Sequence, residues 1–188
     1  MYKRQDVGIR RAVEKGVRSV EHGNFLTIDT AKVMNDHDAH LVPTLVTYEA
    51  DAKYGPSFGW NEENSSKNAE VLSAGLTSLE NALSNNVNVG YGTDLCWSPK
   101  SYQGDGLLIH EKVCGAAEAL RHCTLNNARI VRMEGKIGEI TAGAHADLVV
   151  LDTNPLKSMN CFSQKSNSIV AVLQAGLPVR DDKLLFDW

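Results

Sequence analysis

Apolar residues along this chain follow two different spacings. In Asp6–Lys15 and Glu62–Asn85 they recur every three or four positions, which predicts amphipathic helices. Three shorter runs lack that spacing and predict strands: Val17–Glu21, Leu41–Val46 and Asn86–Asp94. The middle run is almost continuously apolar, as in parallel strands that are buried on both faces.

Several further helices are expected between these runs and after them. Asp29 is the expected N-cap of a helix over residues 30–36, and Leu107–His122 again has helical spacing. Thr124 is expected to cap a short helix that reaches Val131. The aromatic segment Glu49–Asn61 has neither spacing, so it is predicted to be a long loop at the tip of the second strand.

The pattern changes near Glu134, after which glycines at 135, 138 and 143 interrupt it. Continuous β-type runs follow at Leu148–Leu151 and Ile169–Leu173, and Ala175-Gly176 joins the latter to Leu177–Val179 as a hairpin. We therefore expect two parts, residues 1–134 and residues 135–188, with the second part forming strands separate from the first sheet.

Two of the expected strands end in side chains that can do chemistry. Val17–Glu21 leads into His22, and the run that begins at Asn86 ends in Asp94. A histidine and a carboxylate at the carboxyl ends of strands suggest a metal site. Each residue has a plain alternative, because a lone histidine is often a core residue bound to a carbonyl, and Gly-Thr-Asp is common in turns.

Five motifs in order along the chain resemble the second half of a metal-dependent amidohydrolase. They are Glu21-His22-Gly23, Val42-Pro43-Thr44-Leu45, Gly92-Thr93-Asp94, Thr124-Leu125-Asn126-Asn127-Ala128 and the stretch from Gly143 to Asp152. Within that superfamily the chain is most similar to the imidazolonepropionase-related and Xaa-Pro or Xaa-basic dipeptidase-like branch, and the resemblance covers nearly everything after Val7.

The resemblance implies an α/β fold: the C-terminal part of a (β/α)₈ TIM barrel, followed by a segment of a small β-sandwich. Strands six, seven and eight would lie at residues 18–22, 40–47 and 87–94. A whole barrel needs ~250 residues, so this chain of 188 residues cannot close one alone. Met1–Gln5 matches nothing in the family and is interpreted as a truncation scar.

The resemblance also assigns roles to particular residues. His22 and Asp94 would be metal ligands, the metal would be zinc, and Asp94 would relay a proton during hydrolysis by metal-activated water. The other four residues of the usual site have no counterpart here. Tyr48, Tyr54 and Trp97 are candidates for substrate contact, although loop aromatics often pack only against their own loop.

The implied reaction is hydrolysis of a C–N bond in a small N-acyl amino acid or dipeptide. Two alternatives stay open: a deaminase of the same superfamily, and a non-catalytic half-barrel that only associates with itself as a homo-oligomer. The histidine and cysteine residues at 110, 114, 122 and 123 mimic zinc spacing but fit one helix, and His145 and Asp147 are expected to be structural.

Composition excludes several other classes of protein. The net charge of −4, with mixed signs, gives neither a basic stripe for nucleic acid nor a basic block for membranes. No apolar run approaches the ~20 residues that span a bilayer. Four cysteines without Cys-x-x-Cys spacing favour free thiols and a cytoplasmic location, with a lost N-terminal leader left open.

Overall fold

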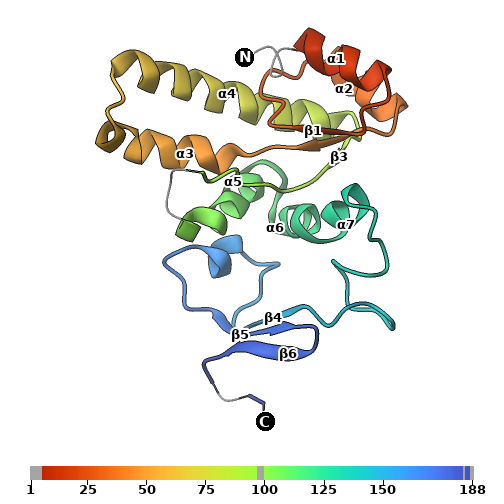
Figure 1. Cartoon of the computed structure of the whole chain (residues 1–188), viewed down its shortest axis with the longest axis vertical. Helices are drawn as coiled ribbons and strands as arrows, with labels where there is room; N and C mark the ends of the chain where they lie inside the picture. Colours follow the sequence, from red (N-terminus) through yellow and green to blue (C-terminus); the bar gives the residue numbers. More distant parts are fainter. Residues whose placement is uncertain (1–5, 97–99, 184, 187–188) are drawn as a thin grey trace.

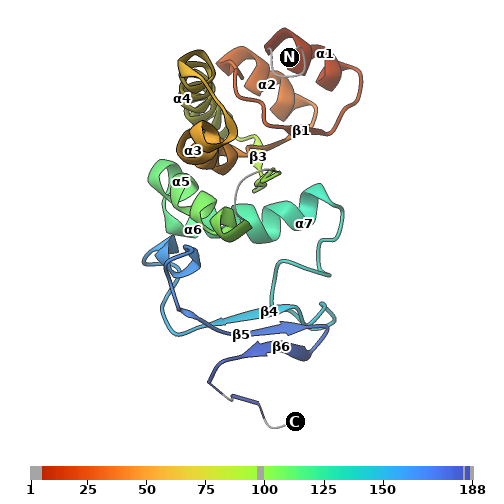
Figure 2. The same cartoon turned by 60° about the vertical axis from the view of Figure 1, so that its left-hand side comes forward.

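The computed structural model describes residues 6–96, 100–183 and 185–186. It is a mixed α/β structure with two three-stranded sheets (Figure 1). The first sheet is parallel, in the order β1-β2-β3, and lies among helices. The second is antiparallel, in the order β4-β5-β6, and lies at the end of the molecule that carries the C-terminus (Figure 2).

The elements around the first sheet alternate between strands and helices. In chain order they are α1 (Asp6–Glu14), β1 (Ser19–Glu21), α2 (Ile28–Asp36), β2 (His40–Val42), α3 (Leu45–Tyr54), a 3₁₀ turn (Gly55–Phe58), α4 (Glu62–Ser84) and β3 (Asn88–Val89). The rest of the helical part comprises a 3₁₀ turn (Lys100–Gln103), α5 (Asp105–Cys114), α6 (Ala116–Arg121), a π-helical turn (His122–Asn126) and α7 (Asn127–Ile130).

The parallel sheet aligns its strands so that their carboxyl ends share one edge. Ser19 pairs with His40, and His40 pairs with Asn88. The strand residues Leu41 and Val89 are almost fully buried, together with apolar residues from α1 to α5. The three strand positions predicted from the sequence are thus confirmed, but each strand is shorter than expected.

The second and third strands end well before the expected bounds, at Val42 instead of residue 47 and at Val89 instead of residue 94. The predictions of a strand over residues 40–47 and of a loop over Glu49–Asn61 are wrong, because β2 stops at Val42 and α3 begins at Leu45. Leu45 and Val46 are buried, but as part of a helix. A short continuous apolar run has no periodicity that separates a buried strand from a buried helix.

Two of the expected helix caps were also wrong. Thr27, rather than Asp29, is the N-cap of α2, and its Oγ1 accepts a hydrogen bond from Thr30 N at 3.3 Å. Thr124 caps nothing, because the chain stays helical through the π turn and the Thr124 hydroxyl donates to Leu120 O at 2.7 Å. Gly115, with φ of 82°, divides the helix expected over residues 107–122 into α5 and α6.

The C-terminal part forms the strands that the sequence predicted. β4 (Leu148–Leu151) pairs with β5 (Ile169–Gln174), and β5 forms a hairpin with β6 (Leu177–Asp181). Asp147 supports this hairpin, because its Oδ1 accepts a hydrogen bond from Ala175 N at 2.7 Å. A 3₁₀ turn, Met159–Phe162, connects this part to α5 through the bond from Met159 N to Glu111 Oε2.

No helix in the described part of the chain is long and apolar enough to cross a membrane. The four cysteines, all within the described ranges, are free thiols, as expected from their spacing.

Candidate active site

His22 and Asp94 come together at the carboxyl edge of the parallel sheet. His22 directly follows β1, and its backbone N–H continues the ladder by donating to Val42 O at 3.0 Å. Asp94 lies five residues beyond Val89, the last residue of β3. The His22 Nε2 and Asp94 Oδ2 atoms are 3.5 Å apart. The expected convergence of these two side chains on one edge of the sheet is therefore confirmed.

Both residues have left-handed backbone conformations, with φ of 68° for His22 and 50° for Asp94. Positive φ is uncommon outside glycine, although Asp and His adopt it more readily than most residues. Such conformations cost on the order of 1–3 kcal/mol and persist only where the surroundings impose them. The chain here turns sharply out of the sheet so that each side chain remains at the edge.

Thr44 controls the orientation of the His22 ring. Its Oγ1 lies 2.7 Å from His22 Nδ1, and the threonine side chain is buried. If Nδ1 donates to Thr44, the lone pair of Nε2 faces Asp94 and is free to bind a metal. If Nε2 carries the proton instead, it faces the Asp94 carboxylate as a donor. Because a hydroxyl can both donate and accept, the contact with Thr44 fixes the plane of the ring and is compatible with either tautomer.

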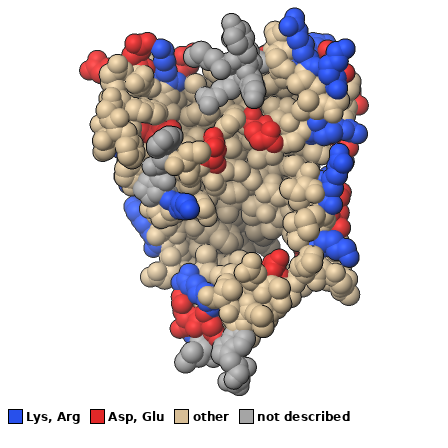
Figure 3. All heavy atoms as spheres, in the orientation of Figure 1, with Lys and Arg blue, Asp and Glu red and all other residues tan. Residues whose placement is uncertain are grey.

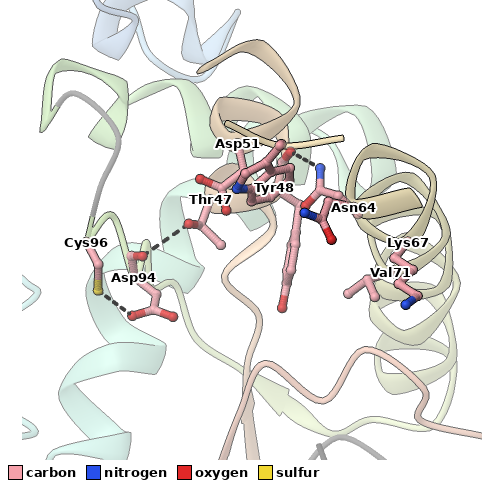
Figure 4. Close-up of a pocket in the computed structure, with 10 residues that line it drawn as sticks. Thr47, Tyr48, Asp51, Asn64, Lys67, Val71, Asp94 and Cys96 are labelled. Carbon is pink, nitrogen blue, oxygen red and sulfur yellow. Dashed lines mark hydrogen bonds between the residues drawn. The ribbon is translucent and has the colours of Figure 1, made fainter. Parts of the chain in front are cut away.

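The two carboxylate oxygens of Asp94 have different neighbours. Oδ2 faces His22, whereas Oδ1 accepts a hydrogen bond from the Cys96 thiol at 3.3 Å (Figure 4). That bond raises the pKa of Cys96, so the sulfur remains a protonated donor. Thr47 Oγ1 donates to the Asp94 carbonyl at 3.1 Å and fixes the backbone.

Asn126 and Asn127 hold the strand that leads to Asp94. Asn126 Nδ2 donates to Val89 O at 2.8 Å, and Asn127 binds both backbone groups of Tyr91, at 3.0 Å to N and 2.9 Å to O. Gly90 permits this approach, because a β-carbon there would collide with the Asn127 side chain. These bonds give a physical role to the two asparagines of the fourth sequence motif.

A cavity of about 500 Å³ opens beside Asp94. Its lining combines hydroxyl, amide, charged and aromatic groups from α3, α4, the link between them and the segment after β3: Thr47, Tyr48, Asp51, Trp60, Asn64, Lys67, Asn68, Val71, Asp94 and Cys96. In Figure 4 the residues from α3 and α4 face each other, and Asp94 and Cys96 lie at one side. The cavity is large enough for a small substrate.

The three residues expected to contact substrate have different places. Tyr48 lines the cavity, and its hydroxyl donates to the buried Asn24 Oδ1 at 3.2 Å. Tyr54 is not among the cavity-lining residues; its ring packs edge-to-face on Tyr102, with centroids 5.8 Å apart. Trp97 lies outside the described residues. A substrate contact by any of the three stays a prediction.

Sequence reasoning missed several polar residues of this site. Thr44 could have been found by the rule that identified His22 and Asp94, because it follows the second strand. Asn68 could not, since it lies within a helix whose prediction depended on its apolar positions. Its Nδ2 donates to Tyr48 O at 2.7 Å and joins α4 to α3.

The described residues contain no group of three or more His, Cys, Asp and Glu side chains that could hold a metal ion. His22 and Asp94 are zinc ligands by type, but a catalytic zinc needs about three protein ligands. The described residues therefore supply suitable types of metal ligand, but fewer ligands than a catalytic zinc needs.

The second histidine cluster has a different geometry. His110 Nδ1 and His122 Nδ1 are 2.8 Å apart, and both rings are buried. Two nitrogens at that distance share a hydrogen bond. Burial lowers the pKa of both histidines, so both rings are neutral.

Comparison with known proteins identifies the class to which this fold and site belong. The sequence profile of the amidohydrolase family matches residues 5–179, and the chain belongs to that family. A crystal structure of a prolidase complexed with N-methylphosphonate-L-proline is similar with a TM-score of 0.87 and 42% identity, covering 94% of this chain and 43% of that one.

Curated relatives include deaminases. The 5-methylthioadenosine/S-adenosylhomocysteine deaminase of Acetivibrio thermocellus is 29% identical over 133 residues, which are 61% of this chain and 31% of that protein. An adenosine deaminase of Xanthomonas campestris with bound zinc shares the fold, with a TM-score of 0.63 and 18% identity. The chain spans less than half the length of each of these three relatives.

Proposed function

We propose that this chain is the part of a C–N bond hydrolase that supplies His22 and Asp94 to a metal site, with the remaining ligands coming from outside it. The observation that carries the proposal is the 3.5 Å approach of His22 Nε2 and Asp94 Oδ2 at the carboxyl edge of a parallel sheet. Catalytic residues of barrel enzymes lie at this edge.

The proposal includes a finer description of the fold. β1, β2 and β3 would be strands six, seven and eight of a (β/α)₈ barrel, and residues 135–188 would be a segment of a small β-sandwich. The strand order, the parallel pairing and the intervening helices support the first statement. The separate antiparallel sheet supports the second, with the boundary near Glu134.

Asp94 is the residue that moves the proton. A divalent metal, zinc in this proposal, would lower the pKa of water and polarise the carbonyl when bound. Asp94 Oδ2 would take the proton of the attacking water and pass it to the leaving nitrogen. Cys96 holds the Asp94 carboxylate, Thr47 holds the Asp94 backbone carbonyl, and Thr44 orients His22.

The cavity supports an N-acyl amino acid or a dipeptide as substrate. It presents the Lys67 ammonium group and the Asn64 and Asn68 amides, which suit a carboxylate, and the Asp51 carboxylate, which suits an amino group. Lys67 also pairs with Glu63 Oε1, so a substrate carboxylate would share its ammonium group with that residue. Deamination is nevertheless a second candidate, because curated relatives 29% identical to this chain are deaminases.

Zinc titration calorimetry and a hydrolysis assay test the proposal. For the 188-residue chain alone we expect weak or absent zinc binding and no turnover of dipeptides or N-acyl amino acids, because it supplies two ligands. Supplying the missing ligands in a longer form should produce turnover, and Asp94→Asn should then lower it by roughly 10²–10⁴-fold. Asp29→Asn, at an exposed residue of α2, is the matched control.

Three outcomes would change this assignment. Tight stoichiometric zinc binding with turnover by the chain alone would show that residues beyond the family pattern complete the site. Turnover of adenosine-type substrates only would favour the deaminase. Persistent inactivity of every longer form, with self-association through the outer strands β1 and β3, would favour the non-catalytic homo-oligomer.

A further inference from the structure

A second cavity, of about 390 Å³, lies at the amino-terminal ends of the same strands, opposite the edge that carries His22 and Asp94. It is lined by Arg18, Asp38, His40, Arg129, Ile130, Arg132 and Glu134. Figure 3 shows Lys and Arg side chains following one another down the edge of the molecule at which α2 and α7 lie in Figure 1.

The arginines of this cavity are held in different ways. Arg129 Nη2 binds Asp38 Oδ1 at 2.7 Å, while Arg18 lies 3.8 Å from Asp38 Oδ2 and donates to the carbonyls of His37 and Asp38. Within the described ranges Arg132 forms no hydrogen bond or ion pair with its side chain, and neither does Glu134. Three guanidinium groups therefore face two carboxylates, and one of the three has no partner among described residues.

His40 adds a buried donor to the same cavity. It is 7% exposed, and its Nδ1 lies 3.4 Å from the amide nitrogen of Asn88. An amide nitrogen can only donate, so Nδ1 accepts and the ring proton lies on Nε2. Among the described residues no hydrogen-bond partner exists for His40 Nε2. This N–H opens into the cavity, where an anion would give it an acceptor.

We propose that this cavity binds a phosphate group, free or as a monoester, with the guanidinium groups of Arg132 and Arg18 and the Nε2–H of His40 as donors. Arginine forks match phosphate oxygens, and a charged acceptor strengthens each bond. The inference is independent of the hydrolase proposal, because it uses no residue of the carboxyl edge.

The competing explanation is that the arginines serve only the end of a helix. Arg129 lies in the last turn of α7, and Arg132 follows that helix with φ of 59°. Cations there offset the partial negative charge of the terminal carbonyls. This explanation predicts an effect on stability and none on phosphate binding, so the two can be separated.

Titration calorimetry of the 188-residue chain with inorganic phosphate, and separately with phenyl phosphate, at constant ionic strength tests the proposal. We expect saturable one-to-one binding that Arg132→Gln weakens about three- to tenfold and Glu134→Gln strengthens, since the latter removes an opposing charge. Arg11→Gln removes the same charge from an exposed position on α1 outside the cavity, and should leave the affinity unchanged.

Binding of inorganic phosphate and phenyl phosphate alike would assign the phosphate group itself as the ligand, and preference for the ester would assign a monoester. The proposal is overturned if neither binds to the folded chain, or if Arg11→Gln weakens binding as much as Arg132→Gln. A lower melting temperature of Arg132→Gln with unchanged phosphate affinity would establish the helix-capping explanation instead.

Discussion

Two pairs of side chains that include histidine differ in their exposure to solvent. His22 is paired with Asp94 at the sheet edge, and the two side chains are 25% and 45% exposed. His110 and His122 are paired with each other between α5 and the π turn, and both are 1% exposed or less. Tyr91 connects the two regions, because it lies near Asp94 in sequence and its ring packs edge-to-face on His110.

The difference shows how surroundings decide what a histidine can do. His22 is partly exposed and faces the carboxylate of Asp94, which lines a cavity, so its ring is accessible to a metal ion. The buried pair has no access to solvent, and its neutral form is enforced by burial. Glu118 Oε1 lies 3.6 Å from His122 Nε2, which is too far for a hydrogen bond, and Arg121 lowers the pKa of His122 further.

The largest expected effect is acid destabilisation through the buried pair. The pKa values of His110 and His122 are lowered in the folded chain, so the unfolded chain binds more protons in acid. Stability is therefore complete above the ordinary value of 6.5 and decreases as the pH falls below it. At pH 4.5 the loss should be on the order of 2–3 kcal/mol per histidine, measured by urea unfolding at several pH values.

A double variant sharpens this test. His110→Leu with His122→Leu should flatten the dependence of unfolding free energy on pH between 6.5 and 4.5. His145→Gln, at an exposed histidine, should leave that dependence as it is. An unchanged slope in the double variant would mean that other groups cause the acid sensitivity.

The next effect concerns the strand segment that carries both Tyr91 and Asp94. Asn127→Ala removes both partners of the Tyr91 backbone and should lower the unfolding free energy by about 1–3 kcal/mol. Asn35→Ala, at an exposed residue of α2, should change it by less than about 0.5 kcal/mol. Equal effects of the two variants in denaturant titrations would remove the structural role assigned to Asn127.

The smallest expected effect on stability is also the most specific to His22. Thr44→Val keeps the shape of the side chain and removes the hydroxyl next to His22 Nδ1, at a cost of about 1 kcal/mol. Nitrogen chemical shifts of the ring should then show a changed ratio of the two neutral tautomers. The same ratio in Thr44→Val and the parent chain would show that Thr44 does not orient the ring.

Much of this molecule could be predicted from local pattern, and the rest depends on tertiary contacts. Long helices such as Glu62–Ser84 and the final hairpin follow from periodicity and turn residues. The helix that begins at Leu45 has the sequence pattern of a strand, because burial on all sides removes the polar positions that reveal a period.

The residues of the candidate site also fall into those that local pattern predicts and those that depend on tertiary contacts. His22 and Asp94 could be identified because both end a strand-like run, and parallel strands bring their carboxyl ends together. The Asn127 contacts with Tyr91, across 36 positions of sequence, could not, since no local signal marks an asparagine side chain that binds a distant backbone. The second cavity was missed because its members are ordinary surface arginines until the strands align their amino ends.

In the proposed hydrolase, the left-handed backbone of His22 and Asp94 would set catalytic activity and thermal stability against each other. A glycine at either position would relieve the strain of positive φ, which offsets part of what the lost side-chain contacts contribute. Selection for thermal resistance alone would therefore constrain these two positions only weakly, whereas the proposed chemistry requires both side chains. A histidine and an aspartate at two such unfavourable positions are what selection for the proposed chemistry would leave in a sequence.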